Sequence, residues 1–282
     1  MTDVYFADQN EGFLFGPGLE TTHDGGQTWS RAELPAVTQL TGSDGYVFAL
    51  SENASDTGAS LWRTTAGSNT WSPLAMPQTS GGFELAAQGS TLLLLQGGFS
   101  GPHPQSAAIE VGALWISTDG GTEWVSRKVP CTSADGGAAL VSIALGHPDA
   151  WLVDCYDNEQ SSQEQQTQHH LYGTGNAGGD WVRLADPTQT GAPALLADNG
   201  SGHAFLATEG GLADWLVGTF DGGLSWSGLF TSGGSFYGWA DLQFVDASTG
   251  FIVGPTHYAP EHLYRTEDGG HTWAVVPITL PS

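Results

Sequence analysis

Three acidic residues, Asp3, Glu84 and Asp241, stand at matching places in segments that are typical of strands. Grouped carboxylates can bind a calcium ion, and two of them can serve as the acid and base that cleave a glycosidic bond. We predict that all three lie near an inner rim on which these strands converge. Acidic side chains also solvate strand edges, so a structural role stays open. No other cofactor and no other metal is expected.

Aromatic residues gather close to one of these carboxylates. Phe236, Tyr237 and Trp239 precede Asp241 among glycines, and Tyr258 follows in a later variable segment. Aromatic faces beside carboxylates suit sugar rings or cationic groups, so these four residues are candidate binding residues. The same rings could instead plug a central channel or cover a junction between elements.

The elements that must position these residues are indicated by an eight-residue turn motif that occurs six times. Its copies are Thr22–Trp29, Thr64–Trp71, Ser117–Trp124, Thr174–Trp181, Thr219–Trp226 and Thr266–Trp273. Four copies carry Asp-Gly-Gly, at Asp24, Asp119, Asp221 and Asp268, whereas Asn176 and Ala66 replace the Asp in the other two. An Asp accepts local N–H groups, the glycines supply positive φ, and the Trp heads a returning strand. The motif therefore predicts a hairpin turn with a structural carboxylate.

The repeating unit is longer than the turn motif and contains four strands, A to D, with the motif in the C–D turn. The frame Val4–Gly16 matches Leu242–Gly254. Six such units, none able to bury both faces alone, predict an all-β, single-domain β-propeller over residues 1–282. Six blades are expected, and a seventh stays open. These residues resemble the Asp-box (BNR-type) repeat family, from Val4 to about Val276.

The resemblance implies a fold that sialidases, other glycoside hydrolases, sorting receptors and photosystem assembly factors share. Sialidases of the family hold the substrate carboxylate with three arginines at the propeller centre. All five arginines here fall beside turn motifs, on predicted third or fourth strands: Arg31, Arg63, Arg127, Arg183 and Arg265. The only lysine, Lys128, cannot reproduce a bidentate clamp. Sialidase activity is therefore not expected.

The charge balance limits the partners further. Six basic residues face 30 acidic ones, which gives a formal net charge of −24. Such a surface repels nucleic acid and anionic lipid, and it is explained by solubility as readily as by a cation site. The longest apolar stretch, Leu92–Leu95, is far shorter than the roughly 18–20 residues that cross a bilayer. We expect neither nucleic-acid binding nor membrane insertion.

The two cysteines, Cys131 and Cys155, flank a predicted hairpin with its turn at 146–149. They could form a disulfide worth roughly 3 kcal/mol, typical of an oxidising compartment, or remain two buried thiols. We expect an extracellular, periplasmic or cell-surface protein whose leader peptide lies outside this sequence. His169 and His170 follow the polar run Ser161–Gln168, which predicts a mobile loop and exposed histidines without metal.

Five loops between strands B and C account for most differences in repeat length. They are Glu52–Ser60, Gly97–Gly112, Tyr156–His169, Thr208–Asp214 and Pro255–His262. Loops that vary on a fixed scaffold are where binding usually resides. We therefore expect a monomeric binding or interaction module that takes a carbohydrate, peptide or protein ligand on this face. The alternative is a non-sialidase glycoside hydrolase or lyase with carboxylates at the channel mouth.

Overall fold

The computed structural model describes most of the chain, with gaps between the described ranges. These ranges are 3–8, 10–34, 36–43, 45–52, 58–77, 83–96, 113–132, 138–143, 146–156, 168–187, 191–209, 213–233, 239, 241–254 and 263–276. The described residues form strands, turns and bends. No helix among them has the length and apolar character that a bilayer crossing requires.

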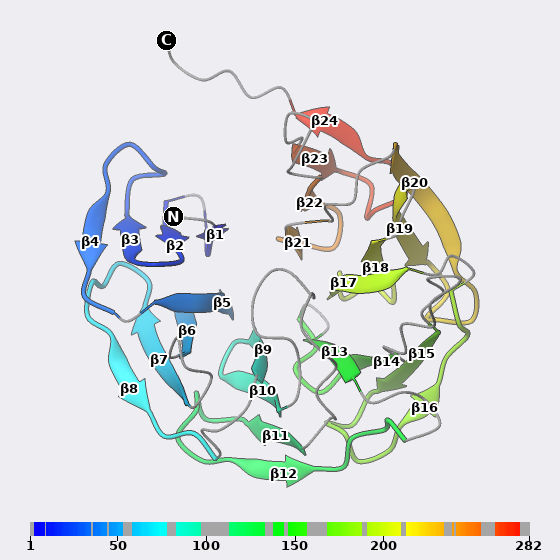
Figure 1. Cartoon of the computed structure of the whole chain (residues 1–282), viewed down its shortest axis with the longest axis horizontal. Coiled ribbons are helices and arrows are strands. Elements are labelled where there is room, and N and C mark those ends of the chain that lie inside the picture. The colour runs from blue at the N-terminus through cyan, green and yellow to red at the C-terminus, as the bar shows by residue number, and fades with distance from the viewer. Residues whose placement is uncertain are drawn as a thin grey trace. The chain divides into compact units, whose positions relative to one another are not determined.

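The described strands form six four-stranded antiparallel sheets, and in every sheet the strands are neighbours in chain order (Figure 1). The fold is all-β, a six-bladed β-propeller, which confirms the predicted architecture and blade number. By compactness the chain divides into two units: unit 1 holds strands β1–β12 and unit 2 holds β13–β24. Each unit contains three of the sheets.

The strand bounds match the predicted four-strand repeat. Unit 1 contains β1 (Asp3–Phe6), β2 (Gly12–Phe15), β3 (Leu19–Thr22), β4 (Ser30–Ala32), β5 (Val37–Ser43), β6 (Tyr46–Glu52), β7 (Ala59–Thr65), β8 (Ser72–Leu74), β9 (Phe83–Gln88), β10 (Thr91–Gln96), β11 (Ala113–Ser117) and β12 (Val125–Arg127). Unit 2 contains β13 (Ala138–Ile143), β14 (Trp151–Tyr156), β15 (His169–Thr174), β16 (Val182–Arg183), β17 (Ala192–Asp198), β18 (Ala204–Glu209), β19 (Ala213–Thr219), β20 (Ser227–Gly233), β21 (Asp241–Phe244), β22 (Gly250–Val253), β23 (Leu263–Thr266) and β24 (Ala274–Val276).

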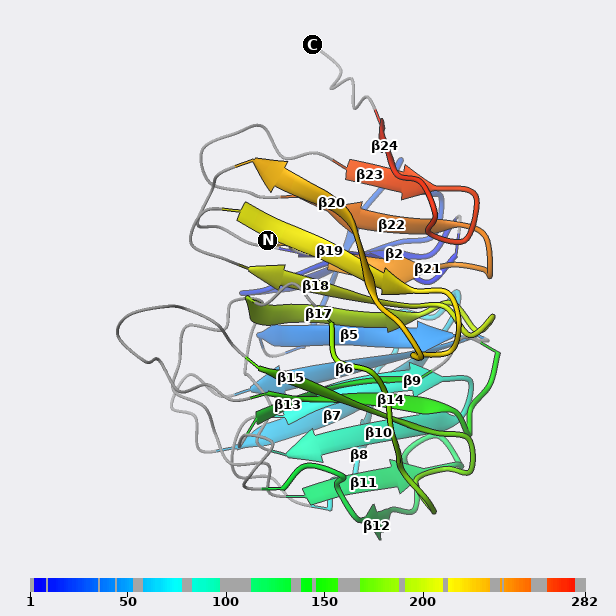
Figure 2. The same cartoon turned by 90° about the vertical axis from the view of Figure 1, so that its right-hand side faces the viewer.

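The core of each unit lies between the faces of neighbouring sheets. In unit 1, Phe13 and Leu19 of the first sheet pack with Val47 of the second. In unit 2, Phe205 of the sheet β17–β20, whose strands lie side by side in Figure 2, packs with Ile252 of the sheet β21–β24. Second strands such as β10 are buried on both faces, which explains their continuous apolar sequence.

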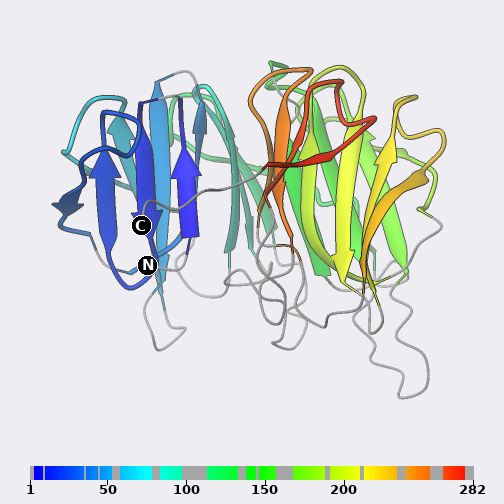
Figure 3. The same cartoon turned by 90° about the horizontal axis from the view of Figure 1, so that it is seen from above.

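Each turn motif lies between the third and fourth strands of its sheet, as predicted. Figure 3 shows the turns that join β19 to β20 and β23 to β24 at one end of unit 2. We call this the turn end, and the opposite end of the strands, where second strands end and third strands begin, the loop end. All five arginines lie on third or fourth strands, which confirms their predicted placement.

The cysteines form the predicted disulfide. Cys131 lies before β13, Cys155 lies in β14, and their sulfur atoms are bonded. The bond ties the approach to the fourth sheet onto the second strand of that same sheet. Cys155 is fully buried, so the disulfide is part of the interior of unit 2.

Candidate functional site

The carboxylates of the turn motifs serve local structure. In the first copy, Thr22 donates to Asp24 Oδ1 at 2.8 Å, and both the amide and the hydroxyl of Thr28 donate to the same carboxylate at 2.8 and 2.6 Å. These bonds hold the pKa of Asp24 down to about 2. The carboxylate is therefore ionised across the physiological range and has its acceptors occupied by its own turn.

The same arrangement recurs at Asp221 and Asp268, whose pKa values are also lowered to about 2, chiefly by hydrogen bonds from Ser225 and Thr272. The pKa of Asp119 is lowered as well, first by the Glu123 amide. Asn176 substitutes without loss of the turn, because its Oδ1 accepts from Thr174 and from the Asp180 amide.

The tryptophans of the turn motifs differ in the hydrogen bonds that their indole N–H groups make. Trp29 and Trp273 donate to the second glycine of their own turn, while Trp124 donates to Ala75 of the preceding sheet. The indole nitrogens of Trp71 and Trp226 are buried without a hydrogen bond within the described residues. Trp181 packs against Trp151 with ring centroids 6.2 Å apart. Their common contribution is packing.

The predicted carboxylate group is distributed over both units. Asp3 opens β1, Glu84 is the second residue of β9, and Asp241 opens β21, so all three lie on first strands as expected. Asp3 and Glu84 belong to unit 1, in sheets with the sheet β5–β8 between them in sequence, while Asp241 belongs to unit 2. Their joint calcium or acid–base role remains a prediction.

Of the four predicted aromatic binding residues, only Trp239 lies within the described part of the chain. Its side chain is 1% exposed and packs among the core residues of the sheets β17–β20 and β21–β24. Its indole N–H donates to the Trp215 carbonyl at 3.2 Å. Trp239 therefore fastens two sheets and offers no open face to a ligand. Phe236, Tyr237 and Tyr258 lie outside the described residues.

The loop end of unit 2 carries a pair of carboxyl groups that composition alone did not single out. Glu209 ends β18, Asp214 lies in β19, and the two are direct cross-strand partners. Asp214 is fully buried, and Glu209 is half-buried with its Oε1 atom enclosed and without a hydrogen bond among the described residues. Burial, followed by the Asp214 charge, raises the pKa of Glu209 to about 7.

A second ionisable pair lies at the same end, on the sheet β13–β16. His169 Nδ1 is 2.7 Å from Asp154 Oδ2, and both side chains are 0% exposed. His169 Nε2 lies 2.9 Å from the Gly191 carbonyl oxygen at the start of the next sheet. An ionised Asp154 and the Gly191 carbonyl are both acceptors, so with these partners the ring donates from both nitrogens as an imidazolium. The expectation of an exposed His169 is therefore wrong.

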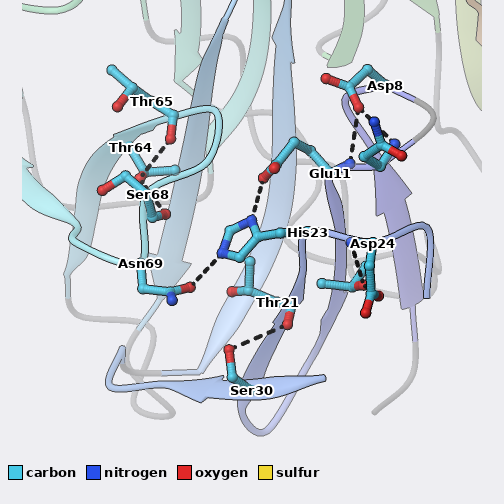
Figure 4. A network of polar contacts seen from close by, with 12 residues as sticks. Asp8, Glu11, Thr21, His23, Asp24, Ser30, Thr64, Thr65, Ser68 and Asn69 are labelled. Atoms are coloured by element: carbon cyan, nitrogen blue, oxygen red, sulfur yellow. Dashed lines mark hydrogen bonds and ion pairs between the residues drawn. The ribbon is translucent and has the colours of Figure 1, made fainter. Parts of the chain in front are cut away.

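Unit 1 contains a comparable pair, formed by a half-buried histidine and a buried glutamate (Figure 4). His23 Nδ1 lies 2.7 Å from Glu11 Oε2, and Nε2 lies 2.9 Å from Asn69 Oδ1 on the adjacent sheet. The side chain of His23 is 32% exposed. The Asn69 bond, followed by the Glu11 bond, raises the pKa of His23.

The two pairs differ from Glu209 in what they can do. His169 has both nitrogens occupied and cannot transfer a proton without breaking a buried bond. Glu209 keeps an oxygen free of hydrogen bonds among the described residues and has a pKa near neutrality. It can hold a basic group as a carboxylate or donate a proton as an acid. The described residues hold no cluster of three or more metal-ligating side chains.

Sequence reasoning named the Thr208–Asp214 loop as variable but did not name its flanking carboxyls. The signal available was that Glu209 and Asp214 are separated by only four residues, two of them glycines. Two acidic residues at the facing ends of consecutive antiparallel strands are brought opposite each other by strand pairing. That spacing could have identified the pair.

The comparisons with known proteins show similarity in fold. No protein-family model and no curated protein sequence matches the chain. The solved structure "YCF48 bound to D1 peptide" is 17% identical with a TM-score of 0.56, over 97% of this chain and 79% of that one. YCF48 from Cyanidioschyzon merolae is 16% identical with a TM-score of 0.58, over 98% and 84%. An ancestral GH74 enzyme is 9% identical with a TM-score of 0.59, and its match covers 97% of this chain but only 40% of the enzyme.

At these identities the likeness shows the β-propeller fold alone. The similar folds include a protein solved with a bound peptide and a glycoside hydrolase. Both functional classes that the sequence left open are thus found on this fold.

Proposed function

We propose that this chain is a binding module of an extracytoplasmic protein, and that it takes a peptide or protein segment with a basic side chain at the loop end of unit 2. The observation that carries the proposal is the Glu209–Asp214 pair. A lysine or arginine side chain beside Glu209 would neutralise the paired carboxyls and fill the hydrogen-bonding capacity of the enclosed Oε1 atom.

Three further properties support this reading. The net charge of −24 favours basic partners through long-range attraction. YCF48, whose fold is similar, is a protein described with a bound peptide. The Cys131–Cys155 disulfide fits an oxidising compartment.

We also propose that the six turn motifs are Asp boxes. In five of them the hydroxyl of the first motif residue donates a hydrogen bond to the side-chain oxygen of the third.

The test is a binding assay with labelled nine-residue peptides that carry lysine, arginine, glutamate or only neutral side chains. We expect saturable binding of the basic peptides alone, weakened about tenfold or more by Glu209→Gln, because the central charge of the site is lost. Glu267→Gln is the matched control, since it removes the same charge at the exposed turn end of the same unit. Equal losses in both variants would mean that only net charge acts, and would contradict the proposed site.

A second candidate function rests on the pKa of Glu209. A carboxyl group with a pKa of about 7 beside another carboxyl matches the acid–base pair of a glycoside hydrolase. Incubation with a panel of oligosaccharides distinguishes the two functions. Turnover that disappears in Glu209→Gln would establish the enzyme and overturn the binding module, whereas peptide binding without turnover supports the module.

A further inference from the structure

A cavity of about 270 Å³ lies at the turn end of unit 2, between the sheets β13–β16 and β17–β20. Its lining residues are Ala150, Trp151, Leu152, Gly173, Thr174, Gly175, Val182, Leu184, Asp198 and Gly222. Trp151, Leu152 and Thr174 are buried and form its floor, while Gly175, Val182 and Gly222 are exposed and form its mouth. The volume is just below the range of about 300–1,000 Å³ typical of ligand sites, so the cavity suits a small molecule.

The cavity has a cause in the sequence. In the next sheet, Phe205 stands second in its strand, opposite the residue before the motif threonine, and its ring packs edge-on against the motif Trp273. Phe13 packs in the same way against Trp71 in unit 1. The equivalent residue of the sheet β13–β16 is Leu152, opposite Gly173. A leucine fills less volume than a phenylalanine. Leu184 takes the place beneath Gly223 that the Phe205 ring takes beneath Gly270, and the space that remains lies beside Leu152.

One carboxylate lines this otherwise mostly apolar space. Asp198 ends β17, and its Oδ1 accepts only the Gly200 amide, at 2.6 Å, among the described residues. No arginine or lysine of the described chain pairs with it. Burial raises the pKa of Asp198, and the Gly200 amide bond, followed by His147 and His203, offsets only part of that effect. Asp246, in the corresponding turn of the next sheet, is exposed, and its pKa is lowered by hydrogen bonds from Ser248 and Thr249.

We propose that this cavity binds a small primary alkylammonium ion, with its ammonium group on the Asp198 carboxylate and its carbon chain along Leu152, Leu184 and Val182. A carboxylate in an apolar cavity is short of compensating charge, and a cation with an apolar tail supplies that charge while it covers the apolar wall. The site is separate from the Glu209–Asp214 pair, because it lies at the other end of the strands. It is therefore independent of the proposed peptide binding.

The test is a ligand-observed NMR titration of the full chain with n-butylammonium, and with n-butanol as the neutral ligand of similar shape. We expect saturable binding of n-butylammonium and at least tenfold weaker binding of n-butanol. Asp198→Asn is expected to weaken n-butylammonium at least tenfold. Leu152→Phe is expected to abolish the binding of both, because the ring would occupy the cavity.

Asp246→Asn is the matched control, since it removes the same charge from the corresponding turn of the neighbouring sheet. We expect its affinity for n-butylammonium to equal that of the unchanged protein. Circular dichroism melting of each variant establishes that it is folded. The proposal is overturned if n-butanol binds as well as n-butylammonium, if Asp198→Asn and Asp246→Asn behave alike, or if the folded unchanged protein does not bind n-butylammonium.

Discussion

The sheet β17–β20 packs against one neighbouring sheet on each face in unit 2, and the two interfaces contain different kinds of side chain. Toward the sheet β21–β24, Phe205 stacks on Phe244 with centroids 4.8 Å apart and packs edge-on against Trp273. Toward the sheet β13–β16, the interface holds the buried Asp154–His169 pair and the cavity beside Leu152. One face is closed by aromatic rings, and the other by an ion pair and an incomplete apolar layer.

This difference shows what each of the two interfaces offers for binding in addition to stabilising the fold. The interlocked rings fill the turn end of the first interface, and the enclosed Glu209 Oε1 atom lies on the same face at the loop end. The second interface keeps both a cavity, beside the short Leu152, and an Asp154 oxygen without a hydrogen bond among the described residues. Polar groups retained at such a cost are candidates for recognition or for specifying the packing.

The largest effect is expected from Asp154→Ala. It leaves the His169 imidazolium buried without its counter-charge, which costs about 3–5 kcal/mol. Urea unfolding monitored by tryptophan fluorescence measures the loss. A cost below about 1 kcal/mol would mean that the pair is not charged. Asp154→Asn keeps the shape and should cost less, because the amide oxygen can still accept from His169.

Phe205→Leu should make the aromatic interface resemble the other one. Removal of the ring beneath Gly270 leaves a cavity, at a cost of about 1–2 kcal/mol. Phe251→Leu is the matched control, because Phe251 holds the same strand position in the last sheet and is only half-buried. Equal losses in the two variants would contradict the packing role assigned to Phe205.

Leu152→Phe tests the reverse change. If the cavity can hold a phenylalanine ring, the substitution should change the free energy of unfolding by less than about 1 kcal/mol. A phenylalanine forced into a core without such space costs about 1–3 kcal/mol. The melting temperature of the variant, compared with that of the unchanged protein, shows which of the two cases applies. A loss typical of overpacking would show that the space beside Leu152 is too small or wrongly shaped.

The smallest effect is expected at the His23–Glu11 pair of unit 1, which is less enclosed than the Asp154–His169 pair. The raised pKa of His23 means that the folded protein holds this proton more tightly than the unfolded chain, so the contribution is complete below pH 6.5 and is lost as the pH rises through the raised value. Exposed pairs contribute about 0.2–1 kcal/mol. Melting temperatures from pH 5 to 9 should converge between the unchanged protein and His23→Gln as the pH increases. A constant difference would assign the effect to packing.

How far the sequence predicted this structure depended on how local the governing contacts are. The turn motifs were predictable, because Thr22, Asp24 and Thr28 make their decisive hydrogen bonds within seven residues. Cys131 and Cys155 were predictable as flanks of one hairpin. From the sequence, Trp239 is a candidate binding residue or a ring that plugs the channel or covers a junction between elements, and His169 is expected to be exposed, because their sequence neighbours are glycine-rich or polar. Their burial depends on the Trp215 carbonyl in β19 and on the Gly191 carbonyl just before β17, which lie 24 and 22 residues away in the sequence.

The Glu209–Asp214 pair is an intermediate case. Each residue alone is one of 30 acidic residues, and only the register of β18 with β19 makes them partners. The shift in the pKa of Glu209 then depends on how deeply the pair is enclosed, which no pattern of residue types specifies. Composition predicted an acidic surface, whereas the position of a carboxyl group with a pKa near neutrality could be found only from the fold.

The proposed peptide site depends most directly on the protonation state of Glu209. Carboxyl-carbon NMR of the protein labelled at glutamate measures that state, and Glu209→Gln assigns the signal. We predict a pKa of about 7 in the free protein and a lower pKa when a basic peptide saturates the site, because a cation beside the group favours its ionised form. A pKa near 4.5 in the free protein, or one that stays near 7 while the peptide is bound, would contradict the proposed site.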